Sequence, residues 1–124
     1  MIAADTSALS FFLRGEIDPA ADKLAAALAA GDLILPPVVT TEILSDQSSA
    51  KLIESIITEI AVLDIKEGYW NRAGVARRTV RQHGLKATIA DTLIAQSCID
   101  NDVALIARDG DFRHFAKYCG LKLA

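Results

Sequence analysis

The sequence begins with Ile2-Ala3-Ala4-Asp5-Thr6-Ser7, a short apolar run that ends at an acidic residue and two hydroxyl residues. Further short apolar runs follow, and we expect each to form a buried strand: 33–35, 61–65, 103–107 and, as a last edge strand, 121–123. Between these runs, residues 20–30 and 89–101 carry apolar side chains at helical spacing. Because strands alternate with helices, the chain is predicted to be an α/β protein with a parallel sheet covered by helices on both faces.

Length and composition favour one folded domain, which we expect to span residues 1–124. Apolar residues make up 52% of the chain, which excludes intrinsic disorder. No apolar run approaches the roughly 20 residues that cross a bilayer, and the N-terminal segment lacks the basic region of a signal peptide. We therefore expect a soluble cytoplasmic protein without a membrane partner, whose two cysteines, Cys98 and Cys119, are reduced and packed.

The formal net charge of −3 argues, taken alone, against a protein that binds nucleic acid. The distribution of charge indicates otherwise. Residues 1–62 contain three basic and nine acidic side chains, whereas residues 63–124 contain ten basic and seven acidic ones. Positive charge is therefore concentrated in the second half of the chain, where it is available for an anionic partner.

Four acidic residues fall where predicted strands end or where the next helix begins: Asp5, Glu42, Asp91 and Asp109. Ligands of open parallel sheets bind beyond the carboxyl ends of the strands, so we expect these four side chains to converge. Clustered carboxylates repel one another unless a cation neutralises them, and an all-oxygen site favours Mg²⁺ or Mn²⁺ over Zn²⁺. Such an ion can activate water for attack on phosphorus, which predicts phosphodiester hydrolysis.

Each acid also has a purely structural interpretation. Asp5 is suited to cap the helix that follows the first strand, and Asp91 completes a near capping box with Thr88. Asp109 is suited to cap a short helix through Phe112 and Phe115, and Glu42 is compatible with a solvated position. No single acid is a specific signal, but four unrelated caps need not meet at one edge of a sheet.

Four segments, taken in order, carry a resemblance to a known family: Ile2–Ser7, Pro36–Ile43, Ala90–Ala95 and Leu105–Phe112. With them the chain resembles a PIN-domain ribonuclease over nearly its whole length, most closely the VapC-type toxins of toxin–antitoxin pairs. The resemblance implies a three-layer α/β/α sandwich with a central parallel sheet and a metal-dependent endoribonuclease that uses Mg²⁺ or Mn²⁺. It also implies a homodimer, an RNA substrate and a cognate antitoxin whose C-terminal segment blocks the active-site groove.

By position, the resemblance assigns the catalytic acids as Asp5, Glu42, Asp91 and Asp109, and the metal ligands as Asp5, Asp91, Asp109 and Asp111. Asp111 matches a more variable fifth acid, for which helix-start electrostatics is the alternative. Thr6 matches a hydroxyl that orients a ligand, with local capping as the alternative. The chain departs from the pattern at Ala107, where members usually carry Thr, and this puts turnover in doubt more than metal binding.

A phosphodiester substrate needs cations around the acids, and six basic residues are candidates for RNA binding: Arg77, Arg78, Arg81, Lys86, Arg108 and Arg113. A solvated surface or pairing with the antitoxin would explain the same residues. Tyr69 and Trp70 are candidates to stack on an unpaired base, although packing is the commoner role of such aromatics. Both histidines lie outside the acidic set, and the sequence contains no base-reading motif.

Three rival classes share some of these features. A receiver domain requires paired acids after the first strand, whereas Asp5 stands alone, and Lys122 is unsuitably placed for the lysine of that class. A haloacid-dehalogenase-type phosphatase requires Asp-x-Asp, and Asp5-Thr6-Ser7 lacks the second acid. The stronger rival is a PIN-like module that binds RNA or a partner without cleaving it, which Ala107 leaves open.

Overall fold

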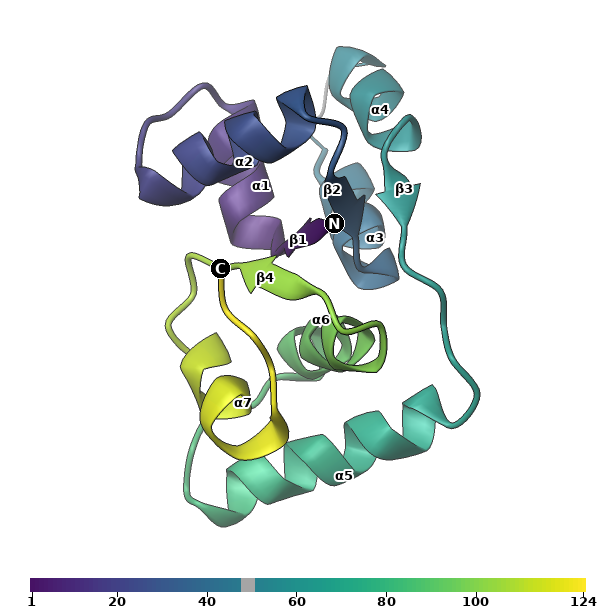
Figure 1. The fold of residues 1–124 in the computed structure, drawn as a ribbon, viewed down its shortest axis with the longest axis vertical. Coiled ribbons are helices and arrows are strands. Elements are labelled where there is room, and N and C mark those ends of the chain that lie inside the picture. The colour runs from purple at the N-terminus through teal and green to yellow at the C-terminus, as the bar shows by residue number, and fades with distance from the viewer. Residues whose placement is uncertain (48–50) are drawn as a thin grey trace.

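Short parallel strands form the centre of the fold (Figure 1). The computed structural model describes residues 1–47 and 51–124, and within them the strands are β1 (Ile2–Ala4), β2 (Leu33–Leu35), β3 (Ala61–Val62) and β4 (Ala104–Ile106). They run in the order β3-β2-β1-β4, and every pair of neighbours is parallel. The two middle strands are short and apolar, and Ala3, Ala4 and Leu35 are fully buried.

The helices of the described residues are α1 (Thr6–Leu13), α2 (Pro19–Ala29), α3 (Pro37–Ser45), α4 (Lys51–Thr58), α5 (Tyr69–Gln82), α6 (Ile89–Asp100) and α7 (Phe112–Cys119). Three of them begin after a polar residue whose side chain accepts a backbone N–H from the first turn: Asp5 before α1, Asp18 before α2 and Thr88 before α6. Capping of this kind satisfies otherwise unpaired donors and explains where these helices start.

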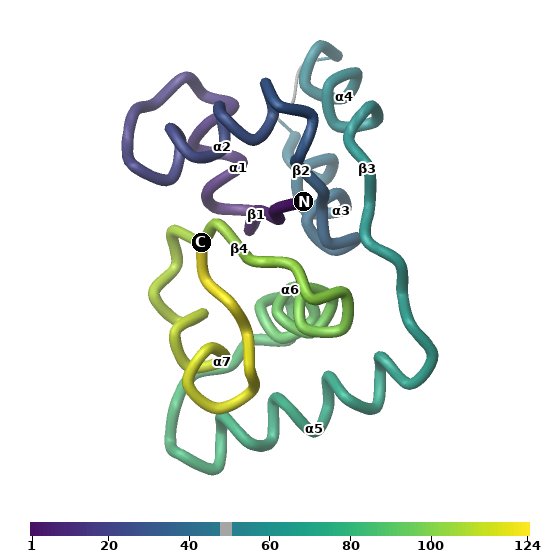
Figure 2. Tube along the Cα trace, viewed as in Figure 1, coloured from purple at the N-terminus to yellow at the C-terminus, as the bar shows by residue number. Residues whose placement is uncertain are grey.

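The helices enclose the strands from two sides, as the ribbon and the tube both show (Figures 1 and 2). On one side α1 packs against α2, and on the other α5 and α7 pack against α6. The apolar side chains that the strands and helices direct inward form one core that includes Leu24, Leu105, Ile106 and Phe115. The predicted α/β class and the three-layer α/β/α sandwich are therefore confirmed.

Two of the predicted strands are shorter in the structure than the apolar runs indicated. The run 61–65 forms a strand only over 61–62, because after the hydrogen bond from Leu63 N–H to Leu35 O (2.9 Å) the chain leaves the sheet toward α5. The run 121–123 forms a single parallel bridge between Leu123 and Leu105. It follows the left-handed turn at Gly120 (φ 82°), and it is joined to Leu105 by hydrogen bonds of 2.9 Å from Leu105 N–H to Lys122 O and from Ala124 N–H to Leu105 O.

Parallel pairing brings the ends of β1 and β4 to the same place. Ala4 is paired with Ile106, and Asp5 N–H donates to Ile106 O at 3.0 Å. The residues that follow the two strands, Asp5 and Ala107, are therefore neighbours although they are about a hundred positions apart in sequence.

Two expectations from composition concern membrane spans and the cysteines. No helix in residues 1–47 and 51–124 has the length and apolar character needed to span a membrane. Cys98 is buried, Cys119 is half-buried, and both thiols are free. The predicted packing of the cysteines is thus confirmed.

Candidate functional site

The four predicted acids line one pocket. Its volume is about 310 Å³ and its walls are Asp5, Thr6, Ser7, Ser10, Glu42, Asp91, Ile94 and Asp109. These residues come from α1 with its cap, from α3, from the first half of α6 and from the loop after β4. The convergence that the strand ends predicted is therefore present in the structure.

Asp5 is the most buried of these acids, with 1% of its surface exposed. Its Oδ1 accepts a hydrogen bond from Ala8 N–H at 2.7 Å, which makes Asp5 the N-cap of α1. Its Oδ2 accepts from the N–H groups of Arg108 at 3.2 Å and Asp109 at 3.5 Å. The structural interpretation and the pocket position thus apply to the same side chain, and they do not exclude each other.

Glu42 enters the pocket from α3 and is held by a hydroxyl from α1. Thr6 Oγ1 donates a hydrogen bond to Glu42 Oε1 at 2.6 Å. Thr6 does not cap α1, because Asp5 occupies the N-cap position. The geometry therefore favours the expectation that Thr6 orients an acid, and the acid that it contacts is Glu42.

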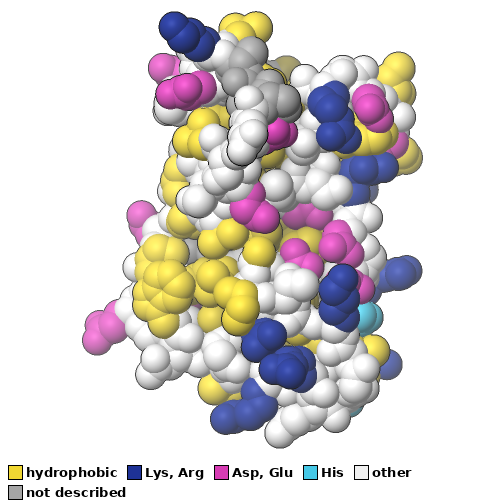
Figure 3. All heavy atoms as spheres, turned by 180° about the vertical axis from the view of Figure 1, so that it is seen from behind, with side chains coloured by type: hydrophobic (Ala, Val, Ile, Leu, Met, Phe, Trp, Pro, Cys, Tyr) yellow, Lys and Arg dark blue, Asp and Glu magenta, His cyan; other side chains and the backbone are white. Residues whose placement is uncertain are grey.

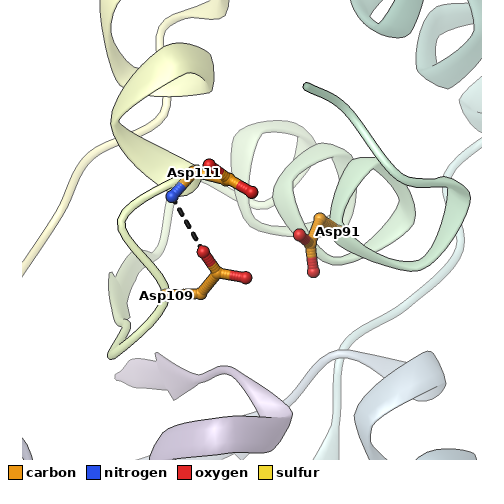
Figure 4. Close-up of side chains that lie close together, drawn as sticks. All are labelled: Asp91, Asp109 and Asp111. Atoms are coloured by element: carbon orange, nitrogen blue, oxygen red, sulfur yellow. Dashed lines mark hydrogen bonds between the residues drawn. The ribbon is translucent and has the colours of Figure 1, made fainter. Parts of the chain in front are cut away.

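Asp91, Asp109 and Asp111 form a tighter group within the site (Figure 4). Each offers a carboxylate oxygen, and the three oxygens lie within 4.8 Å of one another. Asp91 stands in the first turn of α6, where its N–H donates to the capping Thr88 hydroxyl at 3.1 Å. Asp109 Oδ1 accepts from Asp111 N–H at 2.9 Å, so the loop before α7 presents both of its acids together.

The predicted cap of α7 is different from the observed one. Capping of this helix was the structural alternative for Asp109, but the N-cap position belongs to Asp111, whose side chain makes no capping hydrogen bond. The reason is the bond between the Asp109 carboxylate and Asp111 N–H, which closes a tight turn one residue before the helix. The Asp111 carboxylate is consequently not used by the helix.

The carboxylates of the site are close enough to disfavour each other's charge. Burial raises the pKa of Asp5, although backbone hydrogen bonds from Ala8, Asp109 and Arg108 oppose that shift. Burial, followed by repulsion from Asp109, raises the pKa of Asp91 to about 6. A raised pKa means that ionising the carboxyl group costs more free energy in the folded state than in water, and a cation in the pocket would offset that cost.

The donor set fits a hard divalent cation. The three clustered acids offer only oxygen ligands, which suits Mg²⁺ or Mn²⁺ better than Zn²⁺. Of the four metal ligands that the resemblance implied, Asp91, Asp109 and Asp111 form this group. Asp5 lines the acidic pocket together with Asp91 and Asp109, and both of its oxygens are already oriented by backbone N–H groups.

A second pocket, of about 440 Å³, borders the acidic one and is basic. It is lined by Gly74, Arg77, Arg78, Arg81, Gln82 and Ile89, and we call it the arginine cleft. Ile89 and Asp91 both stand in the first turn of α6, so the cleft and the acidic pocket lie at the same end of this helix. Figure 3 shows acidic side chains in the middle of one face with Lys and Arg side chains directly below them.

The arginines of the cleft have no acidic partner among the described residues. Within residues 1–47 and 51–124, the ion pairs of Arg and Lys involve Arg14, Arg72, Lys86, Arg108 and Lys122, and none involves the cleft. Arg77 Nε donates to Ala87 O at 2.8 Å, which orients its guanidinium. Arg78 and Arg81 are exposed. The cleft therefore holds positive charge that the described part of the chain does not neutralise.

The other three basic candidates have different surroundings. Lys86 Nζ lies 3.9 Å from Asp111 Oδ2, at the edge of the acidic group. Arg113 Nε donates to Gly110 O at 3.2 Å on the same side. Arg108 points elsewhere, because its Nε donates to Asp18 Oδ2 at 2.7 Å and its side chain lines a separate pocket.

The two aromatic candidates at the start of α5 have opposite environments. Tyr69 is 1% exposed, and its hydroxyl donates to Leu93 O at 2.7 Å, so it is packed. Trp70 is 64% exposed and lies edge-on to the Tyr69 ring, with centroids 4.9 Å apart. Of these two aromatics, Trp70 is therefore the one available to a base.

Several residues of the site were not predicted from the sequence. Ser7, Ser10 and Ile94 line the acidic pocket. Helical spacing would have been a signal for Ile94, which lies three residues after Asp91, but not for the two serines, which lie two and five residues after Asp5. Ala107 lines the pocket beside Asp18 and Arg108 and is not among the residues that line the acidic one.

Comparison with known proteins agrees with this fold. The family model of the PIN domain matches residues 2–118, which confirms the family resemblance of the sequence motifs. No curated protein sequence gives a significant match. The structure of VapBC2 from Rickettsia felis bound to a promoter DNA fragment has a TM-score of 0.74 at 19% identity, with 100% of this chain and 98% of that chain covered.

Two further solved structures are similar at comparable levels. FitAcB from Neisseria gonorrhoeae has a TM-score of 0.71 at 19% identity, with 99% of this chain and 96% of that chain covered. FitAB bound to the IR36 DNA fragment has a TM-score of 0.71 at 18% identity, with 100% and 94% covered. At these identities the likeness establishes a shared fold.

Asp91→Asn should stabilise the metal-free protein. The pKa of Asp91 lies at about 6 in the folded chain against an ordinary 3.8, so this carboxyl costs stability as pH rises through that window. We expect the variant to gain about 1 kcal/mol in the free energy of unfolding at about pH 7.5 and nothing below about pH 4. Urea denaturation in EDTA, followed by circular dichroism, measures both values.

The matched control is Asp32→Asn, which removes an exposed carboxylate outside the acidic pocket and should change the free energy of unfolding by less than about 0.5 kcal/mol. A loss of stability in Asp91→Asn at neutral pH would contradict the inference that burial and repulsion make the charged Asp91 side chain destabilising.

Proposed function

The chain belongs to the PIN domain family, and we propose that it is a metal-dependent endoribonuclease that hydrolyses RNA phosphodiester bonds as the toxin of a toxin–antitoxin pair. The observation that carries the proposal is the convergence of Asp5, Glu42, Asp91 and Asp109 on one pocket. Of these four acids only Asp5 caps a helix, and the local hydrogen bonds of Asp109 and Glu42 do not require the four carboxylates to meet in one pocket.

Mg²⁺ or Mn²⁺ would be held by Asp91, Asp109 and Asp111 with Asp5 beside them, and would polarise the phosphate and lower the pKa of a bound water. Asp5 is suited to this role because backbone N–H groups fix both of its oxygens before any ligand arrives. Glu42, with one oxygen held by Thr6, is suited to accept the proton of the attacking water.

The arginine cleft supports a polyanionic substrate. A row of carboxylates repels phosphates, so an RNA strand needs positive charge close to the cutting site. Arg78 and Arg81 supply exposed charge beside the acidic pocket, and Arg77 supplies an oriented guanidinium. Exposed Trp70 stands four residues before Gly74 of the cleft on the same helix, which suits it to stack on an unpaired base at the end of this path.

The toxin assignment includes partners and a compartment. The similar structures of VapBC2 and FitAB support a cognate antitoxin as the inhibitor of this chain. We also propose a homodimer, which would cover some of the exposed apolar side chains, such as Ile17 at 86% and Leu52 at 70% exposure. A cytoplasmic site of action agrees with the two free thiols.

The nuclease assignment is tested with purified protein, free of any antitoxin, and structured RNAs. We expect cuts that need Mn²⁺ or Mg²⁺ and disappear in EDTA. Asp5→Asn and Asp91→Asn should each lower the rate by about 100-fold or more, because charge stabilisation at the reacting phosphate is usually the largest single contribution to such catalysis. The surface variant Asp22→Asn should cut like the wild type.

Cleavage that persists in EDTA or in both pocket variants would contradict the metal-dependent mechanism. RNA binding by the wild type without any cleavage would favour the alternative function, a PIN-like binding module.

The role of the arginine cleft is tested by the double variant Arg78→Ala/Arg81→Ala. Both side chains are exposed and lack ion pairs in the described residues, so their removal should leave the fold intact. We expect KM for RNA to rise about tenfold and the slope of log affinity against log salt to fall by one to two, roughly one for each phosphate that the variant no longer neutralises. The charge-matched control, Lys117→Ala/Lys122→Ala, should change KM less than about twofold, and an equal effect of the two doubles would argue against a specific cleft.

Toxicity provides an independent test in cells. Expression of the wild-type chain without an antitoxin should arrest growth, because RNA cleavage depletes a template or a component of translation. Asp5→Asn expressed to the same level should not arrest growth, since it lacks a residue of the pocket. Colony counts after induction, with immunoblots to match protein levels, measure the difference; equal toxicity of the two chains would count against a nuclease toxin.

A further inference from the structure

Arg108 contacts three parts of the molecule at once. It follows β4 and immediately precedes Asp109, and its backbone N–H donates to Asp5 Oδ2 at 3.2 Å. Its side chain extends the other way, where Nε donates to Asp18 Oδ2 at 2.7 Å. The guanidinium carbon lies 3.6 Å from the centroid of the Phe11 ring. A single residue therefore connects the loop after β4 to α1 and to the start of α2.

The two residues that the Arg108 side chain contacts, Asp18 and Phe11, are themselves fixed by the fold. Asp18 is the N-cap of α2, and its Oδ1 accepts from Ala21 N–H at 2.7 Å while its Oδ2 accepts from Arg108. Phe11 belongs to α1, which packs against α2 and is capped by Asp5. Flat stacking on an aromatic face and a charge-assisted hydrogen bond are geometries that a guanidinium satisfies together.

These contacts do not favour a phosphate-binding role for Arg108. Its Nε is already used by a carboxylate, and its side chain lines a pocket with Asp18, Lys23 and Ala107 instead of the acidic pocket. Arg78 and Arg81 of the arginine cleft have no such acidic partner among the described residues. An arginine that is paired and stacked within the protein is better suited to fix geometry than to capture a substrate.

We propose that Arg108 is a positioning residue, whose side chain anchors the loop that carries Asp109 and Asp111 to α1 and α2. The anchor keeps the N–H groups of Arg108 and Asp109 on Asp5 Oδ2, and it thereby holds the acids of both chain segments in the arrangement that binds a divalent cation. The metal-binding half of this inference rests on the proposed function.

Three variants separate positioning from phosphate binding. Arg108→Ala removes the anchor, and Arg108→Lys keeps the positive charge but loses the planar, stacked guanidinium. Asp18→Asn removes the charged partner while asparagine remains a good N-cap for α2. The matched control is Arg14→Ala, because Arg14 also lies near the Phe11 ring, at 5.8 Å, but pairs with Glu16 and not with the loop.

The first readout requires no metal and no RNA. Hydrogen exchange of the metal-free chain should show the amides of Arg108 and Asp109 exchanging about tenfold faster in Arg108→Ala, Arg108→Lys and Asp18→Asn, with no change in Arg14→Ala. The second readout is Mn²⁺ affinity by calorimetry, which should fall about tenfold in the same three variants and less than twofold in the control. The double variant Arg108→Ala/Asp18→Asn should bind Mn²⁺ about as well as either single variant, because both substitutions remove the same ion pair.

The outcomes are distinct from those of the nuclease test. Unchanged exchange of the two amides in Arg108→Ala and Asp18→Asn would overturn the anchor, whatever the activity of the wild type. Faster exchange with unchanged Mn²⁺ affinity would overturn the link to the metal site. Normal affinity in Arg108→Lys together with a lower RNA KM in Asp18→Asn would assign Arg108 to phosphate binding instead. Mn²⁺ binding without RNA cleavage by the wild type would overturn only the proposed function.

Discussion

The buried carboxylate of Asp5 is the contact on which the arrangement of the site depends. One oxygen accepts Ala8 N–H at the start of α1, and the other accepts the N–H groups of Arg108 and Asp109 after β4. A short side chain thus joins the first helix to a loop that lies 103 residues later in the sequence. Because the pairing of Ala4 with Ile106 places these segments side by side, the remaining acids are arranged around a point that the backbone itself defines.

The gathered carboxylates repel one another, and this electrostatic cost indicates a role other than stability. The pKa of Asp91 is raised to about 6 by burial and by Asp109. The charged form of this carboxylate is therefore less stable in the folded chain than it would be in water. A fold selected only for stability would not gather such groups, since a single neutral replacement relieves the repulsion. In the proposed function, a divalent cation would offset this repulsion, and the arginine cleft, which has no acidic partner among the described residues, would attract a phosphate-bearing substrate.

Much of the site could be predicted because it depends on order along the chain. Acids that follow parallel strands must meet at one edge of the sheet, and this rule placed Asp5 and Asp109 together without any knowledge of side-chain contacts. Strand length was harder to predict, because it depends on the partner available to each residue. The run 61–65 leaves β2 after Leu63, and the run 121–123 meets β4 only at Leu105. The apolar character of a segment does not show how many of its residues will find a hydrogen-bonding partner on the neighbouring strand.

The roles of the basic residues could not be predicted for the same reason. In the sequence, Arg108 and Arg78 are both arginines in the basic half of the chain, and their spacing does not show that their roles differ. The difference arises from Asp18, which lies 90 positions away from Arg108 and meets it only because α2 packs beside β4. No equivalent acid meets Arg78 in the described residues. The role of each basic residue therefore depends on whether the fold places an acid beside it. That is a property of the tertiary structure, and a count of charges in the sequence cannot show it.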